Sequence, residues 1–364
     1  MILSIDKTTM RDVTKYQLQV IGSNSDYSVT AEPVLSRESS TVCNYVTIVG
    51  HTNLIPQMEK LELLSGSKIL EVPFKNGRVT APKPVILCIS PQFGAEQWQI
   101  FLAQVHISKY YGAHLHMYII STVDTFYQLV QEYEKLGYVT IDHWIRQQFK
   151  SPGIEFAPDP SINSDYKNQA DIDCFYQYKE AADFITFLDF DDILIPSGFS
   201  SYFDEFNFYA KIHGNQFYYE KRGYLFQKEP SLDEFNIHRI FNHSKYELST
   251  DRVRVISHPK WRRSMDRNGK KNWVDQNFVN HLKLPGTTIF PYQNSIDLPM
   301  NQTDMEDIQL DIDRFRNSTK VLELDKILPT SEYYYQQILG CYTKNHHDIG
   351  VWRKFICPNI EMCK

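Results

Sequence analysis

The chain has 364 residues, of which 42% are hydrophobic and 23% are charged, and its formal net charge is −6 at pH 7. This apolar share excludes a disordered chain, and the length allows two domains or one large α/β domain with an added segment. The acidic balance, with no run of basic residues, argues against a nucleic-acid partner.

The first 80 residues predict a β-rich N-terminal segment. The stretches KYQLQVIG (15–22) and NYVTIVGH (44–51) alternate in polarity, and the turn signals GSNSD and KNGR separate apolar runs. The stretch APKPV (81–85) then marks a boundary.

After this boundary, predicted strands and helices alternate. The apolar runs at 85–90, 115–122, 138–144 and 184–190 are typical of buried parallel strands. Helical spacing of apolar residues fills the gaps, with predicted helix ends at Gly112 and Gly137 and a third helix over 168–183. The order indicates a doubly wound, mostly parallel α/β sheet that binds ligands at the carboxyl ends of its strands.

The pattern is looser beyond residue 200. We expect a helix over 201–214 and a strand over 215–220, then mainly polar loops from 250 to 330 with one helix around 304–316. The predicted domains are therefore a β-rich segment (1–80), the α/β domain (81–330) and a Cys-containing tail (331–364).

The stretch FITFLDFDDILIP (184–196) places Asp189, Asp191 and Asp192 directly after a buried strand. Three close carboxylates repel one another, so a positive partner must compensate them. Oxygen ligands without cysteine suit Mg²⁺ or Mn²⁺, which would in turn hold a diphosphate. The alternative is a purely structural role for the cluster, in which one aspartate is the N-cap of a helix that begins near Ser197.

Two enzyme classes place D-x-D after an apolar strand. Haloacid-dehalogenase-type phosphatases use the first aspartate as nucleophile and the second as general acid. In those enzymes the motif opens the domain, whereas here three predicted strands precede it, and position 193 is Ile where Thr or Val is usual. Nucleotide-sugar glycosyltransferases of the GT-A type, whose D-x-D follows the fourth strand, fit better.

Five stretches, in order, resemble glycosyltransferase family 92 over about residues 84–300. They are CISPQFGAEQWQIFLAQVHISKYYGAHLHMYII, YEKLGYVTIDHW, NQADIDCFYQYKEAADFITFLDFDDILIP, RVISHPKWRRSM and FVNHLKLP. The resemblance implies a GT-A fold and a metal-dependent transfer of a hexose, typically galactose from UDP-galactose, onto a glycan with inversion.

The resemblance also implies roles for single residues. Asp191 is the expected metal ligand, Asp189 is a second ligand or accepts a ribose hydroxyl, and Asp192 supports the site from the side. His281 completes the metal site or binds phosphate, with His258 as the alternative ligand.

Lys283 stands where the family has an arginine, which turns a bidentate clamp for the donor into a point charge. A family histidine falls at Asn268, so a degenerate member that only binds a sugar nucleotide or glycan is an alternative function.

The helix over 168–183 carries further candidates. Asp173 and Gln169 lie four residues apart and share one helix face, which approaches the donor pocket or is simply solvated. Cys174 pairs with Cys88 or is a buried thiol.

An inverting transfer needs a general base that deprotonates the acceptor hydroxyl. The candidates are Glu220, Asp251 and Asp275, and the sequence does not choose among them.

The signals for cellular location conflict. No apolar run approaches the roughly 20 residues of a membrane span, and the N-terminal stretch does not fit a signal peptide, which alone would predict a cytosolic protein. Six cysteines and the sequons at Asn242, Asn301 and Asn317 favour the secretory pathway. The family resemblance implies the Golgi lumen, with an N-terminal membrane anchor that this sequence does not contain.

Overall fold

The computed structural model describes residues 2–6, 18–31, 34–35, 45–50, 55–74, 77–144, 149–151, 154–156, 167–225, 228–242, 245–261, 272–283, 300–338, 340–341 and 344. The chain divides into two compact units. The first unit takes residues 1–77, 145–169 and 336–364, and the second takes 78–144 and 170–335. Among the described helices, none has both the length and the apolar content that crossing a membrane requires.

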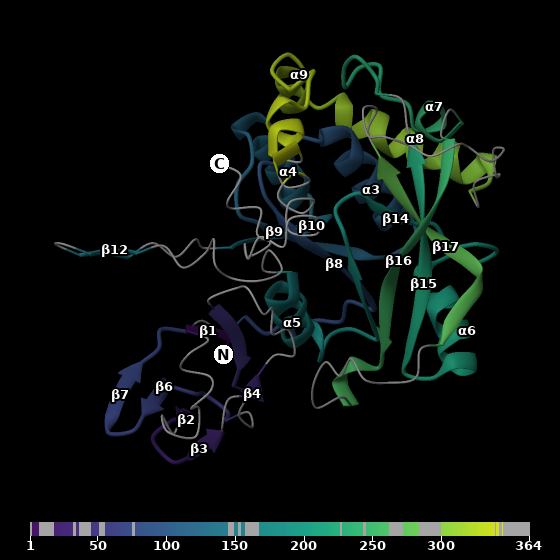
Figure 1. Cartoon of the computed structure of the whole chain (residues 1–364). Coiled ribbons are helices and arrows are strands. Elements are labelled where there is room, and N and C mark those ends of the chain that lie inside the picture. The colour runs from purple at the N-terminus through teal and green to yellow at the C-terminus, as the bar shows by residue number, and fades with distance from the viewer. Residues whose placement is uncertain are drawn as a thin grey trace. The chain divides into compact units, whose positions relative to one another are not determined.

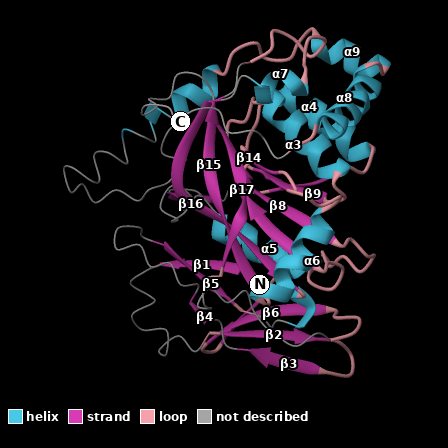
Figure 2. Ribbon diagram, turned by 90° about the vertical axis from the view of Figure 1, so that its right-hand side faces the viewer, coloured by secondary structure: helices cyan, strands magenta, loops and turns pink. Residues whose placement is uncertain are grey.

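The first unit is β-rich, as predicted, and all of its described strand pairs are antiparallel. Its strands form a three-stranded sheet, a four-stranded sheet and a two-stranded ribbon (Figures 1 and 2). They are β1 (Ile2–Asp6), β5 (Tyr45–Val49) and β4 (Val34–Leu35); β3 (Ser28–Ala31), β2 (Gln19–Ser23), β6 (Lys60–Ser65) and β7 (Lys68–Glu71); and β11 (Phe149–Ser151) with β12 (Ile154–Phe156). The domain boundaries near residues 80 and 330 stay predictions.

The second unit is built on one eight-stranded sheet. Its first four strands in spatial order, all parallel to one another, are β10 (Val139–His143), β9 (His114–Ile119), β8 (Val85–Gln92) and β13 (Phe184–Leu188). The sheet continues through β16 (Lys245–Ser257), β15 (Gln216–Leu225), β17 (Trp273–Lys283) and β14 (Asp192–Leu194), of which β15 and β17 are parallel. The expected α/β fold with a mostly parallel sheet is confirmed.

Side chains on the two faces of this sheet explain why its strands are continuously apolar. Leu87 and Ile89 of β8 belong to the main core, whereas Ile86 and Cys88 belong to a second core cluster. The first face is covered by α3 (Trp98–Tyr110) and α4 (Asp124–Lys135), and the second by α5 (Lys167–Tyr178) (Figure 1). Helices on both faces leave no position of a central strand facing water.

The remaining described helices are α6 (Tyr202–His213), α7 (Ile237–Asn242), α8 (Gln302–Arg316) and α9 (Thr319–Asp325). Gly112 and Gly137 follow α3 and α4 with φ of 81° and 76°, so the predicted glycine ends of both helices are confirmed. The predicted helix around 304–316 is also confirmed as α8.

Two local predictions are wrong. The region predicted as mainly loops contains the long strands β16 and β17. The stretch RVRVIS carried the missed signal, since buried Val253 and Val255 alternate with Arg252 and Arg254.

The helix-cap reading of the acidic cluster is wrong as well. α6 begins after Ser201, whose own hydroxyl accepts the hydrogen bond from the backbone N–H of Asp204 at 3.1 Å. None of the three aspartates caps this helix, so their clustering needs another explanation.

Candidate functional site

The three aspartates lie at the carboxyl end of β13, in a tight turn that leads into β14. The backbone N–H of Asp192 donates to the carbonyl of Asp189 at 3.1 Å, and the N–H of Asp189 donates to Asp192 Oδ2 at 2.8 Å. From α3, Gln104 Nε2 donates to the carbonyl of Asp192 at 2.9 Å. These bonds fix the turn, so the carboxylates are held close together despite their repulsion.

Strand pairing brings His281 to this turn. In the antiparallel pair of β14 and β17, Asp192 lies opposite His281, and the N–H of Leu282 donates to the carbonyl of Asp191 at 2.7 Å. His281 Nδ1 lies 3.0 Å from Asp192 Oδ1 and 3.3 Å from Asp191 Oδ1. Ligand atoms of Asp191, Asp192 and His281 all lie within 4.8 Å of one another.

A buried lysine, which sequence reasoning missed, compensates much of the acidic charge. Lys221 of β15 is 3% exposed, and its Nζ lies 2.5 Å from Asp189 Oδ2 and 2.7 Å from Asp192 Oδ2. A weak signal was present, because every second side chain of a strand lies on the same face, which places Lys221 on the face of buried Phe217 and Tyr219. Lys221 is thus part of the positive charge that the sequence analysis expected beside the three aspartates.

The charges of the cluster shift each other's pKa. Burial alone would lower the pKa of Lys221, but Asp192 and Asp189 outweigh it and raise that pKa well above its usual range. Likewise, burial would lower the pKa of His281, whereas Asp191 and Asp192 raise it to about 10. Complete burial raises the pKa of Asp192, and Lys221 opposes that rise. Among the described side chains, three carboxylates therefore face two basic groups, and this balance favours a further cation.

The residues fit a divalent metal ion. Asp192 is saturated, because its carboxylate bonds Lys221, His281 and the backbone N–H of Asp189. Among the described side chains, only His281 pairs with the carboxylate of Asp191, which leaves Asp191 the acid with room for a metal. Carboxylate oxygen and imidazole nitrogen together suit Mn²⁺ or Mg²⁺, provided that His281 releases its proton on binding.

Asp189 is oriented differently from Asp191. Its Oδ1 accepts a hydrogen bond from Ser90 Oγ at 2.9 Å, and its Oδ2 meets Lys221. Ser90 belongs to β8, the parallel neighbour of β13, so Asp189 is tied to the edge of the first half of the sheet. Its predicted roles as a second metal ligand or a ribose acceptor stay predictions.

Other predicted residues lie apart from this cluster. The carboxylate of Asp173 accepts hydrogen bonds from Tyr118 Oη at 2.7 Å and Gln177 Nε2 at 2.9 Å, on the face covered by α5, and Gln169 is buried. The N–H of His258 donates to the carbonyl of Asp183 at 2.7 Å, at the amino end of β13 and so at the edge opposite Asp189.

The positions of the general-base candidates do not show which of them would act as the base. Glu220 and Asp275 are exposed residues of β15 and β17. The side chains of Asp251 and Lys283, and all of Asn268, lie outside the described residues.

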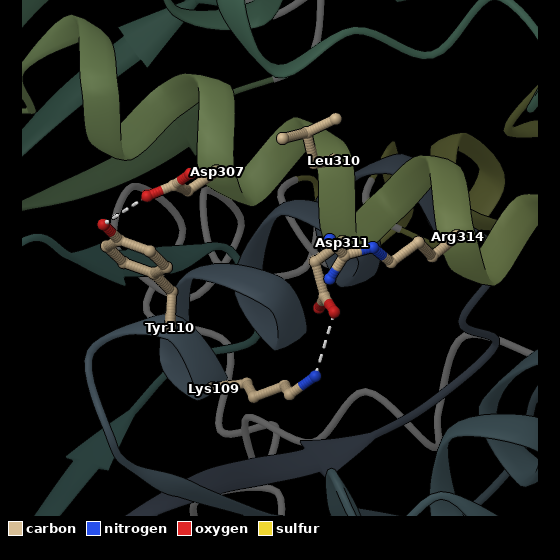
Figure 3. Close-up of a pocket in the computed structure, with 6 residues that line it drawn as sticks. All are labelled: Lys109, Tyr110, Asp307, Leu310, Asp311 and Arg314. Atoms are coloured by element: carbon tan, nitrogen blue, oxygen red, sulfur yellow. Dashed lines mark hydrogen bonds and ion pairs between the residues drawn. The ribbon is translucent and has the colours of Figure 1, made fainter.

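A pocket in the described part of the chain lies between α3 and α8, and none of the residues that line it is a predicted site residue. Figure 3 shows its lining, which is Lys109, Tyr110, Asp307, Leu310, Asp311 and Arg314. Lys109 Nζ lies 3.0 Å from Asp311 Oδ1, and Asp311 Oδ2 lies 2.7 Å from Nδ1 of buried His106. These pairs join two helices, so we assign the pocket to packing and not to chemistry.

Comparisons with known proteins show the family of the chain. The family model described as Glycosyltransferase family 92 matches residues 83–323. Glycosyltransferase family 92 protein ZK381.2 of Caenorhabditis elegans is 35% identical and covers 94% of this chain and 73% of its own. Protein F55C10.4 of the same family and organism is 32% identical over 100% of this chain and 78% of its own.

Among solved structures, S. aureus TarS 1-349 in complex with UDP-GlcNAc is similar at a TM-score of 0.30 and 12% identity, covering 67% of this chain and 70% of that chain. That likeness is too slight to carry an argument. The family model and the two relatives are sufficient: the chain belongs to glycosyltransferase family 92.

Proposed function

We propose that the chain is a metal-dependent, inverting glycosyltransferase that moves a hexose from a UDP-sugar to a glycan. One observation carries the proposal: Asp191 and His281 adjoin at the carboxyl end of a parallel strand, beside more carboxylates than basic groups. Folds of this kind bind nucleotides at that edge. Galactose as the sugar follows from the resemblance to the family.

Each residue of the site has a proposed task. Asp191 and His281 hold a divalent cation, Mn²⁺ or Mg²⁺, with Asp192 orienting the imidazole. A bound cation there would neutralise charge on the departing diphosphate. Lys221 holds the carboxylates of Asp189 and Asp192 in place, and Asp189, which Ser90 also orients, faces the ribose or the metal.

Disulfide bonds support a location in the secretory pathway, and we propose the Golgi lumen. Cys88 and Cys174 form a disulfide between β8 and α5, which is one of the two alternatives that the sequence left open. Cys341 is disulfide-bonded too, with a partner outside the described residues. Disulfides persist in oxidising compartments. Mass spectrometry of the non-reduced protein from secreting cells should find these cysteines paired, and free thiols would contradict the location.

A second candidate function is a binder without activity. Lys221 and His281 already supply two positive charges, which suits a diphosphate without any metal. The two functions are separated by incubating the wild-type chain with UDP-galactose, UDP-glucose or UDP-GlcNAc, Mn²⁺ and a panel of fucosylated and unfucosylated glycans. We expect transfer of one hexose, and an absence of transfer with every donor, alongside measurable UDP binding, would favour the binder.

A further inference from the structure

A C-terminal segment, residues 329–335, is fastened to the loop that follows β8. Trp98 Nε1 donates to the carbonyl of Pro329 at 2.9 Å, and the backbone N–H of Tyr335 donates to Glu96 Oε1 at 2.8 Å. The family match ends at residue 323, before this segment begins. Its attachment is therefore a feature of the structure that the family assignment does not explain.

The anchoring loop lies at the same sheet edge as the acidic cluster. Ala95 bridges to Thr122 in parallel, and the N–H of Gly94 donates to Ser121 Oγ at 2.9 Å, so the loop runs past the carboxyl ends of β8 and β9. β13, which ends at Asp189, is the other neighbour of β8. The segment is thus held beside the edge where the nucleotide is proposed to bind.

Buried carboxylates make the contacts that attach residues 329–335. Glu96 is 3% exposed and Glu332 is 6% exposed, and Glu332 Oε1 pairs with Lys228 Nζ at 2.8 Å. A buried carboxylate is costly unless it is bonded, so each must gain its hydrogen bonds for the segment to dock. Such contacts specify one position of the backbone at Tyr335.

The attachment fixes the backbone position of Tyr335. Its ring packs against the main core while remaining partly exposed, and no described residue hydrogen-bonds its hydroxyl. Burial, and then Asp191 and Glu332, raise the pKa of this hydroxyl well above its usual range. Tyr335 therefore presents an O–H donor without a partner among the described residues, on a segment attached at the sheet edge where β8 and β13 end.

We propose that Tyr335 is a donor-binding residue whose ring and hydroxyl contact the nucleotide sugar held at Asp191, and that Glu96 is the residue that positions it. An aromatic face suits a sugar or base ring, and the O–H suits the oxygen-rich remainder of such a ligand. This inference rests on the proposed function, and it extends the donor site beyond the family match.

The test uses the full chain and the variants Tyr335→Phe, Tyr335→Ala and Tyr334→Ala, the last a matched control because Tyr334 is 56% exposed. UDP affinity is measured calorimetrically with Mn²⁺, beside thermal melts and donor and acceptor KM values. We expect Tyr335→Phe to weaken UDP binding roughly 3- to 10-fold, as for one lost hydrogen bond, and Tyr335→Ala to weaken it more. Tyr334→Ala should match the wild type.

Further measurements distinguish a role of Glu96 in positioning Tyr335 from a role in stabilising the fold. Glu96→Gln should raise the donor KM while leaving the acceptor KM unchanged. If wild type transfers hexose but Tyr335→Phe and Tyr335→Ala bind UDP as Tyr334→Ala does, the inference is wrong while the proposed function stands. If the wild type binds no UDP, both fail. Should Tyr335→Ala unfold, Tyr335→Phe decides alone, and a change confined to the acceptor KM overturns the donor assignment.

Discussion

Two charge clusters in the second unit are balanced in different ways. Around Asp311, one carboxylate meets Lys109 and His106 at 3.0 and 2.7 Å, and His106 also meets Tyr133 Oη at 2.7 Å. Around Asp192, three carboxylates crowd against Lys221 and His281. Counted over the described side chains, the first cluster has a partner for each charge, whereas the second has more carboxylates than basic groups.

The difference separates packing from chemistry. A balanced cluster between two helices is complete without a ligand, even though a pocket happens to adjoin it (Figure 3). An excess of like charge destabilises the fold on its own and is relieved only when a cation arrives. We therefore propose the acidic cluster as the functional site, and the predictions below test this contrast.

Removing one acid of the unbalanced cluster should have the largest effect. Asp191→Asn preserves size but removes the charge proposed to hold the metal, so transfer should fall by about two to four powers of ten. The thermal midpoint should hold or rise slightly, because repulsion is relieved. Asp307→Asn, in the α3–α8 pocket, is the control and should leave transfer unchanged. Near-full activity of Asp191→Asn would refute the site, and its unfolding would make the acids structural.

Removing the lysine from each cluster should cost very different amounts. Lys221→Met leaves a buried carboxylate without its partner, which typically costs about 3–5 kcal/mol. The side chain of Lys109 is 42% exposed, and Lys109→Met should cost at most about 1 kcal/mol, because solvent screens its ion pair. Urea unfolding of both variants measures the two losses. Equal losses would show that Lys221 is not buried against the acids.

The balanced cluster should respond to acid. Burial lowers the pKa of His106 despite the opposing effect of Asp311, so the folded chain keeps His106 neutral. The unfolded chain binds a proton there below about pH 6.5, so stability falls as pH falls through that value. His106→Gln should lose less stability than the wild type between pH 7 and pH 5, by at most about 1.4 kcal/mol per pH unit. Parallel losses would contradict a neutral buried His106.

Asp311 should make the free energy of unfolding fall further at still lower pH. Burial would raise its pKa, but His106 and Lys109 outweigh it and hold the pKa of Asp311 below its usual range. Its contribution is therefore present above about pH 3.9 and lost as pH falls further.

The first half of the second unit was predictable because its strands are buried on both faces. A run such as VILCIS has few readings other than a central parallel strand, and the glycines at 112 and 137 end the helices that follow. The long antiparallel strands β16 and β17 were missed, since charged residues on their exposed positions look like loop residues.

The site was only partly predictable for a related reason. Asp189, Asp191 and Asp192 lie within four positions, so the sequence shows them together. Lys221 and His281 reach them through strand pairings across 30 to 90 residues, which no local pattern encodes. The resemblance to the family indicated His281, but nothing indicated Lys221 except its place in the alternation of β15.

The most direct test of the account is calorimetric titration of UDP into the wild-type chain with Mn²⁺ and then with a chelator. Carboxylate and imidazole ligation alone is weak and exchangeable, and the diphosphate completes it, so UDP should bind at least about tenfold more tightly with Mn²⁺. Asp191→Asn should bind UDP with the weaker affinity under both conditions. Equal wild-type affinities with Mn²⁺ and with chelator would contradict the account, because the donor would then bind without help from the metal.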